Sequence, residues 1–300
     1  MCRSGAATVV QGRILVPLGD AVPSAADHGP LTIIRAGNNG LAQEFREIWA
    51  YRELLQFLVW RSVKVRYKQT AVGAVWAIAQ PAALGVIFSV FFGRYARLPS
   101  DGLPHMVFFM CSVLPWTYFS TALLTTTSSL VDHQNLLTKV YFPRILLPLS
   151  TVLVGLVDFA IALVGLAATL VSYAVPLRST IWLAPVAMAV AVIGALGAGL
   201  WLSAANAYYR DVRHAVPFLV QLLMFASPVV YPASVVPAQW RFVFGLNPIT
   251  GVIETFRWSL TGAGEPPGVV LLTGFAVSVA LVASGLMFFR RVEQTLADVV

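Results

Sequence analysis

Side chains that could carry out covalent chemistry or bind a metal are few and far apart in this sequence. The four histidines, His28, His105, His133 and His214, lie in four separate segments, and none stands at a metal-ligand spacing from another histidine or from a cysteine. The sequence has no G-x-x-x-x-G-K-[ST] phosphate-binding loop and no G-x-S-x-G nucleophile motif. We therefore expect no catalytic residue, metal site or cofactor in this chain. Any energy source must come from another chain or from an ion gradient.

Asp158 is an acidic residue inside an otherwise apolar segment, "LVGLVDFAIALVG". A charge at the centre of a bilayer costs about 2.5–3.5 kcal/mol on insertion scales, so this intramembrane acid is expected to face protein or water. It could handle protons or substrate, or it could form a structural hydrogen bond to a neighbouring helix. The sequence offers no basic partner in another apolar segment, which favours the structural interpretation over a proton relay.

The composition indicates an integral membrane protein. Of its 300 residues 58% are hydrophobic and only 11% are charged, whereas soluble domains carry about 25% charged residues. The net charge of +7 is explained by Lys and Arg gathered on the cytoplasmic side of a membrane, so we expect membrane lipids and no nucleic acid as partners. Two cysteines are too few for a disulfide framework.

The uncharged intervals predict an all-α protein with six transmembrane helices. About twenty apolar residues cross the hydrocarbon core. An even number of spans returns both termini to one side, and the positions of Lys and Arg at the span ends place both termini in the cytoplasm. The predicted spans are residues 71–93, 105–130, 145–173, 181–204, 215–233 and 267–289, within a transmembrane domain of residues 69–300.

Two segments precede the first span. Residues 1–43 show no lasting helical period and are predicted to be a poorly ordered cytoplasmic tail. Residues 44–68 are predicted to form an interfacial amphipathic helix that ends in a cationic collar, Arg61, Lys64, Arg66 and Lys68. Its apolar stripe is expected to lie on the cytoplasmic leaflet; packing on a partner is the alternative. The stripe comprises Ile48, Tyr51, Leu55, Leu58 and Val59.

The segment between the fifth and sixth spans is too polar to cross a membrane and too apolar for a free loop. Asn247 and Pro248 predict a helix start, and Thr261–Gly262 predicts its end. We expect a pair of re-entrant helices in the outer leaflet, with Glu254 and Arg257 in water. The apolar residues Ile253, Phe256 and Leu260 are expected to dip toward the bilayer.

The two longer inner loops, residues 132–148 and 206–218, combine Tyr, Arg and Asp. Loops that only join two helices need only turn residues. This composition indicates a docking surface for a cytoplasmic partner, although interfacial anchoring by Tyr and Arg is an alternative.

Seven motifs in order carry a resemblance to a known family. They are "VRYKQTAVGAVWAIAQP", "LPWTYFS", "LLTKVYFPRILLPLS", "GLVDF", "NAYYRDVRHAVPFLVQ", "SPVVYP" and "LNPITGVIETFRW". Residues 45–290 thereby resemble ABC-2-type permeases, in particular the branch that exports bacterial cell-surface polysaccharides such as O-antigen, teichoic acid or capsule.

The resemblance implies a homodimer paired with two copies of a separate ABC ATPase subunit, which would bind ATP and Mg²⁺. It implies ATPase-coupling loops at Leu136, Lys139, Tyr141, Tyr208, Arg210, Asp211 and Arg213. It implies a periplasmic gate at Asn247, Pro248, Glu254 and Arg257. Candidate aromatic residues of a channel between the two copies are Trp76, Phe88, Phe91, Phe92 and Phe225, each of which could instead face lipid.

The implied substrate is a lipid-linked glycan that crosses the bacterial inner membrane. The collar from Arg61 to Lys68 could hold the anionic head of the lipid carrier, although anchoring on the cytoplasmic side explains the same residues. Two alternatives stay open. One is an ABC-2 permease for a drug or a lipid, and the other is a membrane-embedded enzyme that processes glycans or lipids.

Overall fold

The computed structural model describes residues 9–10, 13–14, 41–68, 73–137, 139, 142–264, 266 and 268–299. The chain divides into two units, Met1–Gln43 and Glu44–Val300. In the first unit the two-residue strands β1 (Val9–Val10) and β2 (Arg13–Ile14) pair antiparallel. Most of the predicted N-terminal tail lies outside the described residues.

All described secondary structure from residue 41 onward is helical, which confirms the predicted fold class. The α-helices are α1 (Leu41–Ala50), α2 (Arg52–Lys68), α3 (Val75–Phe88), α4 (His105–Asp132), α5 (Gln134–Leu137), α6 (Leu146–Ser172), α7 (Leu183–Tyr208), α8 (Val212–Phe225), α9 (Arg241–Gly245), α10 (Pro248–Thr261) and α11 (Val269–Val299). A π-helix η1 (Ser89–Tyr95) extends α3, and short 3₁₀ helices lie at Ser179–Trp182, Ala233–Val235 and Ala238–Trp240.

Five helical segments in the described residues are long and apolar enough to cross a membrane: Val75–Tyr95, His105–Asp132, Leu146–Ser172, Ser179–Tyr208 and Val269–Glu293. They coincide with five of the six predicted spans. The predicted fifth span, 215–233, corresponds to the 14-residue helix α8, which ends before Ser227 and Pro228. At 1.5 Å per residue α8 is about 21 Å long, shorter than the roughly 30 Å hydrocarbon core. The count of six spans stays a prediction.

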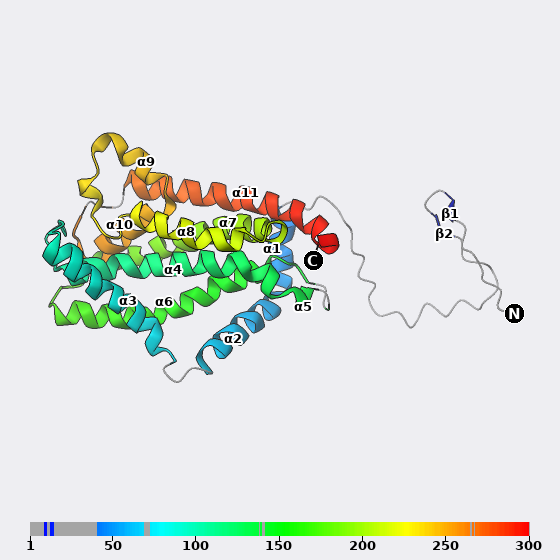
Figure 1. Ribbon diagram of the computed structural model, residues 1–300, viewed down its shortest axis with the longest axis horizontal. Coiled ribbons are helices and arrows are strands. Elements are labelled where there is room, and N and C mark those ends of the chain that lie inside the picture. The colour runs from blue at the N-terminus through cyan, green and yellow to red at the C-terminus, as the bar shows by residue number, and fades with distance from the viewer. Residues whose placement is uncertain are drawn as a thin grey trace. The chain divides into compact units, whose positions relative to one another are not determined.

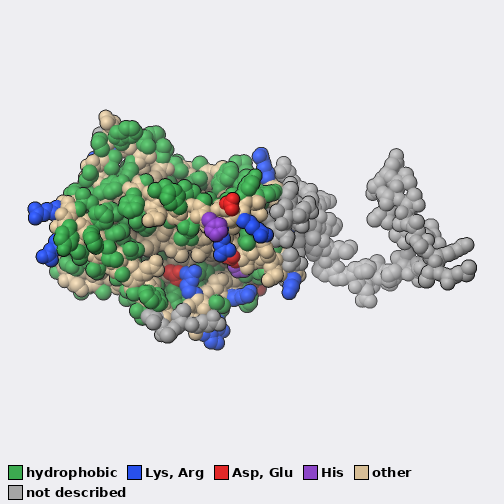
Figure 2. Space-filling view, in the orientation of Figure 1, with side chains coloured by type: hydrophobic (Ala, Val, Ile, Leu, Met, Phe, Trp, Pro, Cys, Tyr) green, Lys and Arg blue, Asp and Glu red, His purple; other side chains and the backbone are tan. Residues whose placement is uncertain are grey.

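Helix α4 lies at the centre of the helical unit, where the long helices α4, α6, α7 and α11 run side by side (Figure 1). It packs against α3, α6, α7, α8 and α10. In its most apolar stretch 78% of residues are buried, against 17% in α11, so α4 is enclosed by protein while most residues of α11 are only partly covered. Hydrophobic side chains cover much of the face in Figure 2, and charged and histidine side chains gather mainly in one region of it. This surface suits a bilayer.

Helices α7 and α11 pack closely because glycines face each other. A Cβ added to Gly197 would lie 2.5 Å from the backbone nitrogen of Val282. A Cβ added to Gly285 would lie 2.7 Å from the Gly197 carbonyl oxygen. Small residues that let backbones approach are a common packing device between helices in membranes.

Four of the five residues of the apolar stripe in residues 44–68 pack on the chain itself, and the position of the segment at the membrane interface stays a prediction. The structure divides the segment into α1 and α2 at Tyr51. Leu58 is buried in a hydrophobic cluster that also contains residues of α4, α6, α7 and α11. Ile48, Tyr51 and Leu55 are partly buried and pack against this cluster. A leucine-rich protein surface is as apolar as lipid, so the helical period alone could not distinguish them.

Candidate functional site

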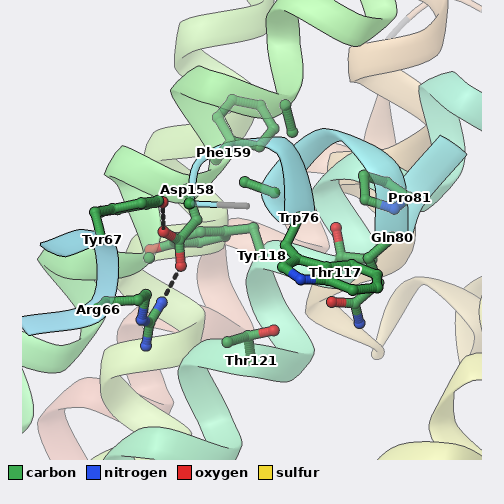
Figure 3. A pocket seen from close by; sticks show the side chains of 14 residues that line it. Arg66, Tyr67, Trp76, Gln80, Pro81, Thr117, Tyr118, Thr121, Asp158 and Phe159 are labelled. Carbon is green, nitrogen blue, oxygen red and sulfur yellow. Dashed lines mark hydrogen bonds and ion pairs between the residues drawn. The ribbon is translucent and has the colours of Figure 1, made fainter. Parts of the chain in front are cut away.

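Asp158 of α6 accepts hydrogen bonds from two residues at the end of α2. The Arg66 guanidinium forms an ion pair with its carboxylate, and the Tyr67 hydroxyl donates to the other carboxylate oxygen. Figure 3 shows both side chains converging on Asp158. Asp158 is twelve residues from the start of α6, or about 18 Å along the helix axis. The end of α2 therefore reaches the middle of a membrane-spanning helix.

The sequence offers Asp158 no basic partner in another apolar segment, and the structure supplies one from outside these segments. The partner comes from the collar, which was not counted because it lies outside the apolar segments. A paired acid costs less to place in a membrane than an isolated one, so the structural interpretation of Asp158 is favoured. Burial and the bond to Asp158 raise the pKa of Tyr67 above its ordinary value, so its hydroxyl stays protonated and donates at neutral pH.

A pocket of about 260 Å³ opens beside this ion pair, between α2, α3, α4 and α6. In Figure 3 Trp76, Gln80 and Thr117 lie on one side of it, and Asp158 with Arg66 and Tyr67 lies on the other. The full lining is Arg66, Tyr67, Gly73, Trp76, Ala77, Gln80, Pro81, Thr117, Tyr118, Thr121, Gly155, Asp158, Phe159 and Ala162. Three of these residues, Arg66, Trp76 and Asp158, are candidates from the sequence alone, but nothing in the sequence indicates that they lie together.

A second cavity of about 430 Å³ adjoins the collar. It is lined by Leu58, Arg61, Ser62, Val65, Arg66 and His133. Arg66 lines both cavities, and Arg61, Lys64 and Lys68 of the collar are exposed. The second cavity therefore gathers Arg61, Arg66 and His133, a set of groups that suits an anionic ligand.

The two inner loops are joined to each other. The Arg213 guanidinium lies 3.7 Å from the Asp132 carboxylate at the end of α4. The buried side chain of Asn206 accepts from the Arg213 backbone N–H at 3.1 Å and donates to the Thr127 carbonyl at 3.0 Å. Nothing in the sequence distinguishes Asn206 from an ordinary residue at a helix end.

The other predicted coupling residues lie on the surface around this junction. Lys139, Tyr208, Arg210 and Asp211 are exposed, and Leu136 packs half-buried against the cluster that holds Leu58. Tyr141 lies outside the described residues. The structure thus provides one polar surface that unites parts of both loops.

Helix α10 begins and ends as predicted, but its charged residues are not in water. The Asn247 side chain accepts from the Ile249 N–H at 3.3 Å, Pro248 is the first helical residue, and Gly262 ends the helix with a φ of 72°. Arg257 is fully buried: it pairs with Glu254, donates to the Ser112 hydroxyl at 3.0 Å, and its guanidinium lies 4.1 Å from the centre of the Phe108 ring.

The apolar face of α10 is also inside the protein. Ile253, Phe256 and Leu260 are buried against the core, so the expectation that they reach the bilayer was wrong. Helix α10 packs against α4, α7 and α11. A gate built from α10 would therefore have to move with the core around it.

The candidate channel aromatics divide into two groups. Phe88 is buried in the core, with its ring 5.6 Å from Phe92 and 5.8 Å from Phe109, so it does not face a channel between copies. Phe92 is half-buried beside it. Trp76, Phe91 and Phe225 are exposed and can meet a ligand, lipid or a second copy.

Comparison with known proteins gives a consistent family assignment. Residues 53–261 match the family described as ABC-2 type transporter. The chain is 31% identical to the O-antigen export system permease protein RfbA of Myxococcus xanthus over 253 residues, which is 83% of this chain and 96% of that protein.

More distant relatives cover similar lengths. An O-antigen export system permease protein RfbA of Klebsiella pneumoniae is 24% identical over 82% of this chain and 95% of its own length. The polysialic acid transport protein KpsM of Escherichia coli is 22% identical over 81% of this chain and 94% of its own length. The chain belongs to the ABC-2 type transporter family.

Proposed function

We propose that this chain is the transmembrane permease of an ATP-driven exporter that moves a lipid-linked polysaccharide across the bacterial inner membrane. The observation that carries the proposal is the 31% identity, over 96% of its length, with a relative named as an O-antigen export permease. The relative named for polysialic acid transport supports the same class of cargo. The five apolar helices provide the membrane domain that such a permease needs.

In this proposal the chain supplies a path and a two-state gate, and a separate ATPase supplies the energy. The active unit would be a homodimer bound to two ATPase subunits that carry ATP and Mg²⁺. The surface around Asp132, Arg213 and Tyr208 would be the ATPase contact, because it joins both inner loops and exposes charged and aromatic groups. Both termini would then lie in the cytoplasm, on the side of the collar.

The proposal is tested by depleting the chain in its host and measuring glycolipids by mass spectrometry at the surface and inside the cell. We expect one lipid-linked polymer to disappear from the surface and accumulate inside. A polymer that is never made would instead favour an enzyme of glycan assembly. No change in any glycan, with loss of efflux of a drug or a lipid, would favour a permease for another cargo.

A further inference from the structure

We propose that the pocket between α2, α3, α4 and α6 binds a single sugar ring of the exported polysaccharide. This inference rests on the proposed function, because it names a sugar subsite within one copy of the permease. The pocket is formed by residues of the four helices α2, α3, α4 and α6.

The size of the pocket suits one ring. Its volume is about 260 Å³. A cavity of about 150 Å³ in another protein holds a benzene molecule, so this pocket has room for a six-membered ring with hydroxyl groups. A longer piece of polysaccharide would not fit inside it, and the rest of a chain would have to leave through the open side.

The apolar part of the lining includes three aromatic side chains. Trp76, Tyr118 and Phe159 come from α3, α4 and α6, and the Tyr118 and Phe159 rings meet edge to face with centres 6.1 Å apart. Trp76 is 62% exposed, although a large apolar side chain gains free energy when it is covered. A sugar ring has an apolar face of C–H groups that would cover this indole.

The polar part of the lining offers hydrogen bonds at several points around the same space. Among the described residues, no hydrogen bond is formed by the Gln80 amide or by the Thr121 hydroxyl. Both groups can donate and accept, as sugar hydroxyls can. The Asp158 carboxylate accepts from Arg66 and Tyr67 and has lone pairs for about two further donors. An apolar lipid chain would leave these groups unsatisfied, which is costly.

The second cavity lies next to the pocket, because Arg66 lines both. Arg66 separates the two, and the second cavity also contains Arg61 and His133. A phosphate-linked sugar would place its anionic phosphate near Arg61 and Arg66 and its ring beyond Arg66, against Trp76. The charge distribution thus matches a sugar attached to an anionic lipid carrier better than a free neutral sugar.

The test is photo-crosslinking in living cells that carry the full chain and its ATPase. A benzophenone amino acid replaces Gln80 in the pocket, and in a matched control it replaces Val164, an exposed α6 residue outside the pocket. Each variant is irradiated in cells that make the polymer and in cells that lack the transferase for its first sugar. We expect a sugar-containing adduct at position 80 only in cells that make the polymer.

Each outcome decides a different point. If the unmodified chain restores surface polymer but position 80 gives no sugar adduct, the pocket inference fails and the proposed function stands. The inference also fails if position 80 gives the same adduct in cells without the polymer, since the occupant is then a membrane lipid. An equal sugar adduct at position 164 also overturns it. If the unmodified chain does not restore surface polymer, the proposed function fails, and the inference with it.

A second measurement uses variants without a bulky probe. Thr121→Val combined with Gln80→Leu removes two hydrogen-bonding groups and should slow export about tenfold at equal membrane levels. Thr125→Val is the control, because the Thr125 hydroxyl lies one turn away and donates to the Thr121 carbonyl at 2.8 Å outside the pocket. Export by the double variant at the rate of the control would overturn the inference.

Discussion

Arg66 on α2 and Asp158 on α6 form an ion pair although 92 residues separate them in the sequence. The pair fastens the end of the collar to the middle of a membrane-spanning helix. It also forms one wall of the pocket, so the attachment of α2 and the shape of the pocket depend on the same two groups.

A double-mutant cycle on Arg66→Gln and Asp158→Asn should reveal this coupling. Each single variant should lower the free energy of unfolding by about 1–2 kcal/mol, since a charged hydrogen bond is lost and Arg66 is partly exposed. The double variant should lose clearly less than the sum of the two. Unfolding in mixed detergent micelles measures all four proteins, and strictly additive losses would show that the two residues do not interact.

Replacement of Glu254 should be among the most damaging single changes on α10. Glu254→Gln leaves the fully buried Arg257 without its opposite charge, which costs about 3–5 kcal/mol for a buried pair. The combined variant Glu254→Gln and Arg257→Met removes the buried charge and should recover part of this loss. Thermal unfolding of the purified chain checks both, and a combined variant less stable than Glu254→Gln would contradict the explanation.

Gly197→Ala should disrupt the contact between α7 and α11. The new methyl group would lie 2.5 Å from the Val282 backbone nitrogen, so the helices must separate, at a cost of about 1–3 kcal/mol. Gly268→Ala is the matched control, because the nearest atom to its methyl group would be 3.8 Å away. The two proteins are compared by unfolding midpoint, and equal midpoints would rule out a tight contact at Gly197.

Asp132→Arg should impair export without unfolding the chain. The Asp132–Arg213 pair is 46% and 58% exposed, so its loss costs less than about 1 kcal/mol of stability. Repulsion between two cations should nevertheless separate the inner loops that we propose to contact the ATPase. The exchange Asp132→Arg with Arg213→Asp should restore part of the activity. Surface polymer and ATP hydrolysis by the complex provide the readout, and a fully active Asp132→Arg variant would exclude a coupling role for the pair.

Features with local causes could be predicted from the sequence. Asn247, Pro248 and Gly262 define the ends of α10 through cap geometry within a few residues, and the structure confirms both ends. Five spans follow from the lengths of the apolar runs, one of which contains Asp158. The comparisons confirm the family resemblance. It could be seen in the sequence because many motifs occur in the same order as in the family.

Features that depend on long-range contacts could not be predicted. Hydropathy placed Arg257 in water, whereas Ser112 and Phe108 from α4 complete a buried site around it. The partner of Asp158 lies in a helix that no span count includes. The stripe around Leu58 was correctly identified as apolar, but its period does not say whether protein or lipid covers it.

The surroundings of the α2 side chains limit how this helix can move. Leu58 packs against the protein, whereas Phe57 and Trp60, on other sides of α2, are exposed. We expect the exposed Phe57 and Trp60 to contact lipid, and moving them into water would cost about 1.5–3 kcal/mol for Phe57 and a comparable amount for Trp60. Lifting α2 away from the bilayer is therefore expensive, whereas sliding it within the plane of the membrane keeps the side chains covered. Any displacement of this helix during a transport cycle is therefore expected to be parallel to the plane of the membrane.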